Sequence, residues 1–440
     1  MKRSLLIRAL LGLAFYACIL DQAAAQFTLS AEVRPRSEYR HGFKKLFNAD
    51  TQDPAFFIEQ RTRLISTYQD DKLDFVLSLQ DIRIWGSEKQ IYKPSAGVSP
   101  NFSSVHQAWG RYKFNNAFAI KAGRMELDYD NARFLGDLGW AQQSRSHDAL
   151  VFEYRDSTSR LDVGLAYNQD ANTPEYGKLL STFYGQTGNY KTMQYVHYHK
   201  DFNKAGLSAL FLNNGLQGAR DSLGNADTYF SQTLGLVGTF NVSKTKFELE
   251  AYYQFGKDGA DKSISAFLLG ASATLPLTGK TSFTLGGDYV SGTELTSTKN
   301  NSFNPLYGTN HKFYGFMDYF YVGNASAQMG KTIGLINPYA KFKFGLGKGK
   351  ALLAHVHQFI SPVTIYSDPE TQTGDLSSSL GTEVDLVFNA DLAANTNVKV
   401  GYSQLFATES MQQIKGGNRE DMQNWFWVMV TFKPTFFKSK

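Results

Sequence analysis

The sequence predicts an all-β fold: a transmembrane, antiparallel, up-and-down β-barrel of about 18 strands, within a range of roughly 16–18. Three observations predict it. Apolar and polar residues alternate with a period of two from one end of the chain to the other. The segments between these runs are short and long by turns. Aromatic residues are abundant, with 34 Phe and 24 Tyr against only 11 Pro, and no run reaches the ~20 apolar residues of a transmembrane helix.

The alternation is clear in residues 246–255, "KFELEAYYQF". Phe247 and Leu249 fall on one face of this segment, and Lys246 and Glu248 fall on the other. Successive side chains of a strand point to opposite faces, so such a run predicts a strand with one apolar and one polar side. We expect strands of this kind near 27–40, 56–69, 72–85, 104–114, 117–128, 147–155, 159–169, 191–201, 205–213, 227–240, 244–255, 263–276, 281–291, 333–345, 349–360, 380–390, 397–406 and 425–437.

The connections decide between a soluble sandwich and a membrane barrel. Every second connection is short, for example "QDDK", "DSTS", "FNKA" and "LTGK". The long ones are 41–55, 86–103, 129–146, 170–190, 292–332, 361–378 and 407–424. Outer-membrane barrels sort their connections into short periplasmic turns and long extracellular loops, whereas a sandwich has no reason to do so. The pattern therefore predicts a membrane barrel with both termini on the periplasmic side.

The faces and the last strand agree with this prediction. A barrel of this size does not fill its lumen with side chains, so the polar face lines a wet interior and the apolar face meets lipid. The closing strand 425–437 carries aromatic residues at both ends, among them Trp425 and Phe437. Aromatic residues gather at membrane–water interfaces, which fits a strand that spans the outer membrane.

The first residues have the pattern of a secretory signal peptide. Lys and Arg precede an apolar core, Ala9–Leu20, that is too short to span a bilayer, and Ala23–Ala25 offers a cleavage site. We expect a signal peptide over 1–25 and one barrel domain over 26–440, in the bacterial outer membrane. Cys18 raises a lipoprotein alternative, although it lies inside the apolar core.

Composition excludes several classes of protein. Cys18 is the only cysteine, so the mature chain has no disulfide framework, no thiol nucleophile and no cysteine metal site. The formal net charge of +5 is too even for a nucleic-acid partner. The expected partner is instead the lipid of the outer membrane.

The polar faces of several strands carry a ladder of basic residues. Guanidinium groups stay charged and present a flat fork of donors that suits carboxylate or sulfate, so a ladder of them suits a path for acidic sugars or other anions. The alternative is that they pair with Glu32, Glu38, Glu59, Asp74 and Glu153 and stiffen the wall. The predicted lumen residues are Arg34, Arg36, Arg40, Arg61, Arg63, Arg111, Lys113, Lys121, Lys341 and Lys343, joined by Lys246 and Lys399.

Residues 122–150 break into a loop dense in charge, Gly and aromatics. We expect this loop to fold inward, to be held by ion pairs to the wall and to narrow the pore. Its predicted constriction residues are Arg124, Glu126, Arg133, Trp140, Arg145 and Asp148. The strand phase of Phe118 and Ile120 points Arg124 towards lipid, which requires a β-bulge or a position above the membrane.

The same block carries a resemblance to a known family. The block contains a Gly-Arg pair, an acidic residue, an Arg before a Gly, a Trp, and an Arg-x-x-Asp motif that enters the next strand. In this sequence they are Gly123 and Arg124, Glu126, Arg133 and Gly136, Trp140, and Arg145 and Asp148. With "RTRL", "LQDIRIWG" and "FNPLYGTNHKFYGFMDYF", the block resembles the alginate-export family of outer-membrane barrels as it occurs in Bacteroidetes-like bacteria.

The resemblance implies an eighteen-stranded barrel with an electropositive constriction that passes a negatively charged polysaccharide outward. It also implies loop-to-wall contacts for Arg124, Arg133 and Arg145. The expected partners are then an anionic sugar polymer or a small anionic solute, and periplasmic export proteins.

Three other functions are alternatives to this one: an outer-membrane hydrolase, a general passive porin and a non-conducting structural barrel. The His197–His199 and His355–His357 pairs each lack a third ligand nearby in the sequence, and no Ser or Cys catalytic motif is present. We therefore expect no enzyme, no catalytic residue, no metal site and no cofactor, with an outer-membrane hydrolase as a minor alternative. A general passive porin is the main alternative. A non-conducting structural barrel would need its lumen blocked by 129–146 and 292–332, the second being either a sugar-binding segment or a self-packed cap.

Overall fold

The computed structural model describes residues 25–87, 102–169, 184, 189–219, 222, 226–323 and 326–439. The predicted signal peptide lies outside these residues apart from Ala25, so it remains a prediction. Most of the predicted loops 86–103 and 170–190 also lie outside them. Within the described residues, no helix has the length and apolar character to cross a membrane.

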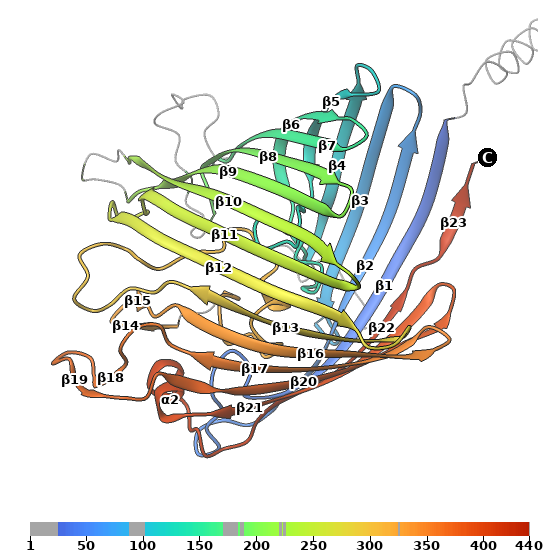
Figure 1. Cartoon of the computed structure of the whole chain (residues 1–440). Coiled ribbons are helices and arrows are strands. Elements are labelled where there is room, and N and C mark those ends of the chain that lie inside the picture. The colour runs from blue at the N-terminus through green and yellow to red at the C-terminus, as the bar shows by residue number, and fades with distance from the viewer. Residues whose placement is uncertain are drawn as a thin grey trace, which may run out of the picture.

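In the described part of the chain, eighteen long strands form one closed antiparallel sheet, as predicted (Figure 1). Each strand pairs with its neighbours along the chain, and β1 pairs with β22 and β23 to close the barrel. The strands are β1 Gln26–His41, β2 Ala55–Gln69, β3 Leu73–Ile84, β4 Phe102–Lys113, β5 Phe118–Met125, β6 His147–Arg155, β7 Ser159–Tyr167, β8 Thr192–Phe202, β9 Ala205–Gln217, β10 Thr228–Val242, β11 Thr245–Lys257, β12 Ser263–Pro276, β13 Thr281–Val290, β16 Leu335–Gly347, β17 Lys350–Ile360, β20 Ser379–Ala393, β21 Thr396–Ala407 and β22 Gln423–Phe432.

Short elements decorate the barrel. They are β23 Thr435–Lys438, the pairs β14 Ala327–Gln328 with β15 Lys331–Thr332 and β18 Tyr366–Asp368 with β19 Thr373–Asp375, the 3-10 turn η1 Asn310–Lys312 and the helix α2 Glu409–Lys415. The predicted closing strand 425–437 is thus divided into β22 and β23. Pro434 explains the break, because it has no N–H for the ladder, although its carbonyl accepts a hydrogen bond from Ala31 N at 3.0 Å.

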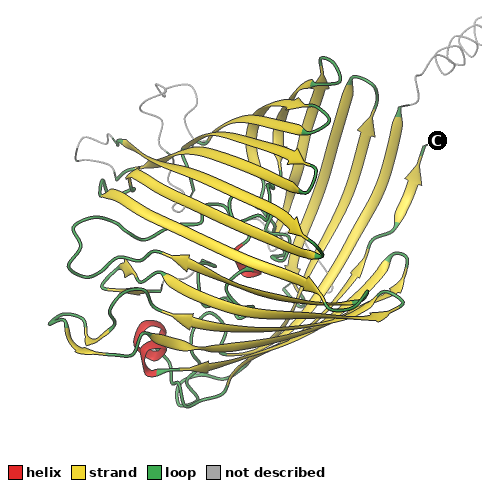
Figure 2. Cartoon of the chain, viewed as in Figure 1, coloured by secondary structure: helices red, strands yellow, loops and turns green. Residues whose placement is uncertain are grey.

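The connections separate to the two ends of the barrel as predicted. The short turns lie at the end that holds both termini, and the longer loops, α2 and the small hairpins lie at the opposite end (Figures 1 and 2). One connection at the long-loop end, 258–262, is itself short. Asp258 closes it by accepting hydrogen bonds from Ala260 N and Lys262 N, both at 2.9 Å.

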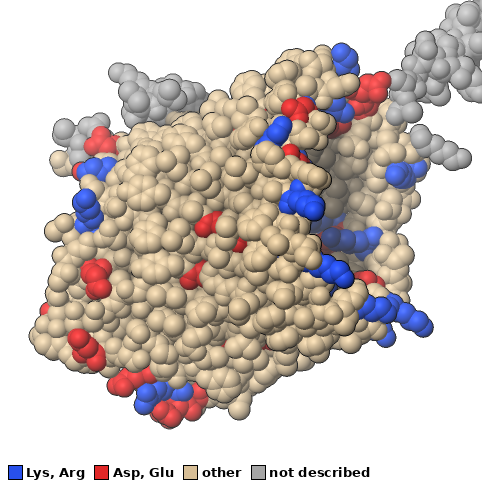
Figure 3. Space-filling view, viewed as in Figure 1, with Lys and Arg blue, Asp and Glu red and all other residues tan. Residues whose placement is uncertain are grey.

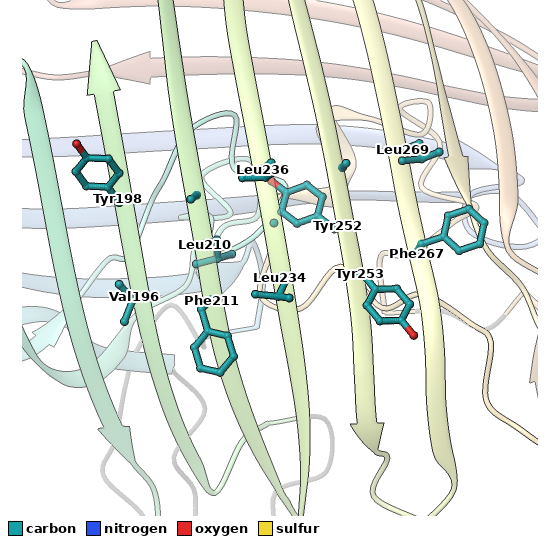
Figure 4. Close-up of a pocket in the computed structure, with 13 residues that line it drawn as sticks. Val196, Tyr198, Leu210, Phe211, Leu234, Leu236, Tyr252, Tyr253, Phe267 and Leu269 are labelled. Atoms are coloured by element: carbon teal, nitrogen blue, oxygen red, sulfur yellow. The ribbon is translucent and has the colours of Figure 1, made fainter.

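The outer face is apolar and the inner face polar. On β9 to β12, side chains such as Phe211, Leu234, Leu236, Tyr253 and Phe267 are exposed and line a shallow apolar groove on the outside of the wall (Figure 4). A closed barrel leaves no unpaired strand edge, so an apolar outer face of this kind can lie in hydrocarbon.

Glycine and aromatic residues face one another on the inner side of the wall. At four register pairs, a Cβ on the glycine would overlap the ring on the adjacent strand. The missing side chain lets the ring lie flat against the neighbouring strand, which fills the inner surface of a curved sheet. The pairs are Gly164–Tyr195, Gly235–Tyr252, Gly286–Tyr339 and Gly401–Trp427.

Candidate functional site: a lumen narrowed by two inward loops

Two loops fold into the barrel and form a hydrophobic core there. We call them L3 (residues 126–146, between β5 and β6) and L7 (residues 291–334, between β13 and β16). The loop residues of this core are almost fully buried. They include Leu127, Phe134, Leu135, Phe303, Tyr314, Met317, Tyr319 and Phe320. L7 therefore packs inside the barrel with L3.

The two loops are joined by their backbones. Gly136 N donates to Tyr307 O at 2.7 Å, and Thr309 N donates to Ala132 O at 2.9 Å. At Gly308 a Cβ would overlap the carbonyl of the residue facing it in L3, so only glycine allows this close approach. L3 and L7 thus form one packed unit.

Arginines of the wall hold L3 by its carbonyl groups. Arg34 donates to Gly139 O at 2.7 Å, to Trp140 O at 3.1 Å and to the side chain of Gln142 at 3.0 Å. Arg34 lies directly opposite Arg61 in the β1–β2 register. Like charges in that position repel, and the loop oxygens placed between them offset the repulsion.

Arg61 and Arg63 differ in how their guanidinium groups are satisfied. Arg61 pairs with Glu32 at 2.5 Å and donates to Ser144 Oγ at 2.9 Å. Arg63 donates through Nε to Gln80 at 2.8 Å, but its Nη2 is buried with no hydrogen-bond partner among the described residues. Arg63 is therefore a buried cation with free donor capacity.

Trp140 of L3 lies at an aromatic junction. Its ring stacks on His311 of L7 with centroids 4.6 Å apart, and Trp425 and Trp427 of β22 meet it edge-on at 5.7 and 4.8 Å. The guanidinium of Arg36 lies 4.3 Å from the ring centroid, and donates to Trp140 O at 2.8 Å. L3, L7 and two wall strands thus meet at one side chain.

Arg133 fixes L3 to the opposite wall. Its guanidinium pairs with Glu250 of β11, and with Asp288 of β13 at 2.6 Å, and donates to Tyr314 OH at 2.9 Å. Burial by itself would lower the pKa of Arg133, but Asp288 and Glu250 outweigh it and hold that pKa well above its ordinary value. The Arg133 guanidinium is thus charged, and it is paired with two carboxylates of the wall.

Nearer the termini, the basic residues of β4 and β5 pair with acids. Arg111 bridges Glu153 and Asp74, the second at 3.1 Å, and Lys113 reaches Asp74 at 2.6 Å. Lys121 instead lies 4.0 Å over the ring of Trp109. This part of the wall has the paired character that the alternative interpretation expected.

Three inward lysines have no such partner. Lys341, Lys343 and Lys399 form no ion pair within 4.0 Å of a carboxylate in the described residues, although Lys341 lies 4.3 Å from the Tyr339 ring centroid. Figure 3 shows the barrel hollowed at the end near the termini, with Lys and Arg predominating on the visible rim.

The other predicted constriction residues, and Arg40 of the predicted lumen set, contact different parts of the barrel. Arg124 and Asp148 do not belong to the inward loop: they pair at 3.0 Å on the outer face, with side chains 41% and 59% exposed, as the phase of β5 requires. Glu126 contacts His106 at 2.8 Å. Arg145 reaches L7 instead of the wall, donating to Gly308 O at 2.9 Å. Arg40 pairs with Glu38 at 2.8 Å.

The Alginate export family model matches residues 25–424. The chain belongs to the alginate-export family. A search of curated proteins found no match. Among solved structures, the barrel is similar to OccAB4 of Acinetobacter baumannii, with a TM-score of 0.60 at 13% identity over 94% of this chain and 99% of that one. It is also similar to OccK2 (OpdF) of Pseudomonas aeruginosa in complex with glucuronate, with a TM-score of 0.57 at 12% identity over 93% and 98%.

This alginate-export barrel is an outer-membrane channel for solutes, and both its family and its fold are those of transport channels. The sequence had indicated the basic ladder and its acidic partners in the wall, but not its contacts with L3. No local signal pairs Arg34 with the carbonyls of L3, or Arg133 with Glu250 and Asp288. Those contacts join residues more than a hundred positions apart.

Proposed function

We propose that this channel passes anionic solutes, in the first place acidic oligosaccharides or polysaccharides of the alginate type. The path is a lumen lined by Arg and Lys and narrowed by L3. The observation that carries the proposal is Arg63, whose buried Nη2 has no hydrogen-bond partner among the described residues. A guanidinium without a carboxylate partner leaves uncompensated positive charge in the inner wall, and this charge attracts a passing carboxylate.

The charge of the surrounding wall supports the same choice. Arg34 and Arg63 form no ion pair with a carboxylate in the described residues, and neither does Lys399 on β21. An unbalanced positive wall attracts anions and repels cations. The inner faces of β1 and β2 carry Arg34, Arg36, Arg40, Arg61 and Arg63 against Glu32, Glu38 and Glu59.

A uronate is a suitable ligand chemically. The similar barrel OccK2 was solved in complex with glucuronate, a sugar carboxylate. In alginate-like chains each sugar carries one carboxylate, so a polymer would offer one anion after another to a row of cations. Direction is not a property of a passive barrel, and periplasmic partners would supply it.

A second candidate is a general passive porin. The observation that favours it is the pairing of Arg61 with Glu32 and of Arg111 with Asp74, which neutralises part of the lumen. Such a pore would show little preference between anions and cations of similar size.

Ion selectivity tests the proposal. We would measure the reversal potential of the purified barrel in planar bilayers under a KCl gradient, for wild type, Arg63→Ala and Lys399→Ala. Arg124→Ala is the matched control, because Arg124 is 41% exposed and pairs with Asp148 on the outer face of the barrel. We expect anion preference that falls in both lumen variants and not in the control.

Solute identity is tested in the same bilayers. Oligouronates should block the current at lower concentration than neutral oligosaccharides of equal length, and Arg63→Ala should remove that difference. An unselective pore that both sugars block equally would favour the general porin. A barrel without conductance would favour a structural protein, and both results would overturn the proposal.

A further inference from the structure

A group of potential metal ligands lies in the barrel wall, away from the arginine ladder. β17 and β20 are antiparallel neighbours, and their register places His355 opposite Asp385 and His357 opposite Glu383. Residues two apart in a strand share a face, so all four side chains point into the lumen. One donor atom from each of His355, His357 and Asp385 lies within 4.8 Å of the others.

Three buried atoms of this group have no hydrogen-bond partner elsewhere in the described residues. His355 Nδ1 and Asp385 Oδ2 are buried without a hydrogen-bond partner in the described residues, and so is Glu383 Oε2. Asp385 is only 1% exposed and Glu383 is fully buried. Buried polar atoms are normally paired. A proton shared between the two carboxyl groups would satisfy two of these three atoms, whereas a metal ion would satisfy all three.

The surrounding hydrogen bonds orient His357 for metal binding. The Asn337 amide donates through Nδ2 to Asp288 at 3.1 Å and to Phe313 O at 3.1 Å. Its Oδ1 must therefore face His357 Nδ1, 3.0 Å away, and that nitrogen must carry the proton. The lone pair of His357 is then on Nε2. A metal-bound histidine usually donates a hydrogen bond from its other ring nitrogen in this way.

Asp385 is held in the same way. Ser403 Oγ donates to its Oδ1 at 2.5 Å, which fixes the carboxylate. Glu383 Oε1 accepts the N–H of Met317 at 2.9 Å, and Glu383 also lies within hydrogen-bonding reach of Asp385. A metal ion at this place would replace the proton that two adjacent carboxyl groups otherwise share.

The two acids also lack a counterion. Neither Glu383 nor Asp385 forms an ion pair within 4.0 Å in the described residues. The nearest basic strand neighbour is Lys341, the register partner of His355 on β16, and its ammonium lies over Tyr339. A divalent cation would balance the two carboxylates.

We propose that His355, His357 and Asp385 bind a divalent transition-metal ion of the Zn²⁺ type, with Glu383 or water in the remaining position. Two imidazoles and a carboxylate select such ions over Ca²⁺ and Mg²⁺, which prefer oxygen ligands. Zinc bonds of ~2.0–2.2 Å bring ligand atoms closer together than 4.8 Å, so the His355 ring turns inward on binding.

The position suggests what the ion would do. Phe316 of L7 lies over His355 with centroids 5.2 Å apart, and the neighbouring Met317 is bound to Glu383. The site therefore lies where L7 rests on the wall. His355 itself is only partly buried, which gives the ion a way in.

The chain offers a matched control. A second histidine pair, His197 and His199 on β8, also faces the lumen, but both rings are engaged. His197 contacts Asp130 at 2.9 Å, and His199 contacts Ser208 at 2.8 Å and Asp201 at 3.0 Å. A variant in this pair therefore shows whether any two lumen histidines are enough to bind the metal.

The test uses full-length barrel without a histidine tag, extracted in detergent and treated with chelator. After gel filtration with ZnCl2, elemental analysis should give one zinc per chain, and Co²⁺ should give visible d–d absorption. Replacing a residue that only orients a ligand lowers metal affinity roughly 10–100-fold, so Asn337→Ala should lose affinity in that range. Asp385→Asn and His355→Gln each remove a ligand and should lower zinc affinity further. His199→Gln should bind as wild type.

Folding is checked separately by the heat-modifiable gel mobility of each variant, so loss of metal and loss of the barrel are distinguished. The proposal is overturned if wild type binds no stoichiometric metal, or if Asp385→Asn and His355→Gln bind as tightly as wild type. A proton shared between Glu383 and Asp385 would then take the place of the ion, and its carboxylic-acid infrared band would persist in excess zinc.

Discussion

The ring of Trp140 stacks on the imidazole of His311, with centroids 4.6 Å apart and planes 9° apart. The first residue belongs to L3 and the second to L7. His311 is held in turn by Asp318, whose carboxylate lies 2.6 Å from Nδ1. This ring contact adds to the backbone hydrogen bonds that join the two inward loops.

Removing the Trp140 ring should loosen the constriction. Trp140→Ala loses the stack on His311 and two edge contacts with Trp425 and Trp427, each worth about 0.5–1.5 kcal/mol beyond its buried area. We expect a larger and noisier single-channel conductance. Trp85→Ala is the control, because Trp85 is 54% exposed and bonds to Gln60 outside the lumen. Equal conductance in wild type and Trp140→Ala would contradict this role.

Arg133 should be the main electrostatic anchor of L3. Arg133→Met leaves Glu250 and Asp288 buried without their cation, and breaking a buried ion pair costs about 3–5 kcal/mol. We expect a lower urea midpoint in detergent. The triple variant Arg133→Met, Glu250→Gln, Asp288→Asn removes both charges and should regain most of the loss. A triple variant as unstable as the single one would show that packing, and not charge, is responsible.

Gly401 should be intolerant of a side chain. A Cβ at this position would overlap the indole of Trp427, so Gly401→Ala must displace the ring. Overpacking of this kind costs about 1–3 kcal/mol. Gly238→Ala is the matched control, since no atom lies within 4 Å of its added Cβ. We expect the unfolding temperature on heat-modifiability gels to fall for Gly401→Ala only, and equal temperatures would refute the argument.

Lys415 in α2 should make stability depend on pH. Burial, and then the nearby Lys45 ammonium, lower the pKa of Lys415 from 10.5 to about 7. The unfolded chain therefore binds this proton more tightly than the folded chain. The resulting penalty is complete below pH 7 and declines as the pH rises towards 10.5.

Replacing this lysine removes the penalty. Lys415→Met should raise the unfolding temperature more at pH 6 than at pH 9, measured by circular dichroism. Lys257→Met, at a 46% exposed side chain, should show no such difference between the two pH values. A gain for Lys415→Met that is equal at both pH values would exclude titration as its cause.

The sequence by itself determined the barrel. In a strand with lipid on one side and water on the other, apolar and polar side chains must alternate with a period of two. Each strand carries this alternation within its own residues, so all eighteen strands were predicted. The outward direction of Arg124 also followed from the phase of β5. Pro434, which divides the last strand, could have been anticipated from its missing N–H.

Only the tertiary structure decided what the inward side chains contact. Arg34 was predicted on the polar face, yet its partners are the carbonyls of L3, more than a hundred residues away. His355 and His357 lacked a third ligand in the sequence, and the β17–β20 register brings Asp385 beside them. Register and the inward path of loops depend on closure of the whole barrel, and no short window of sequence contains that constraint.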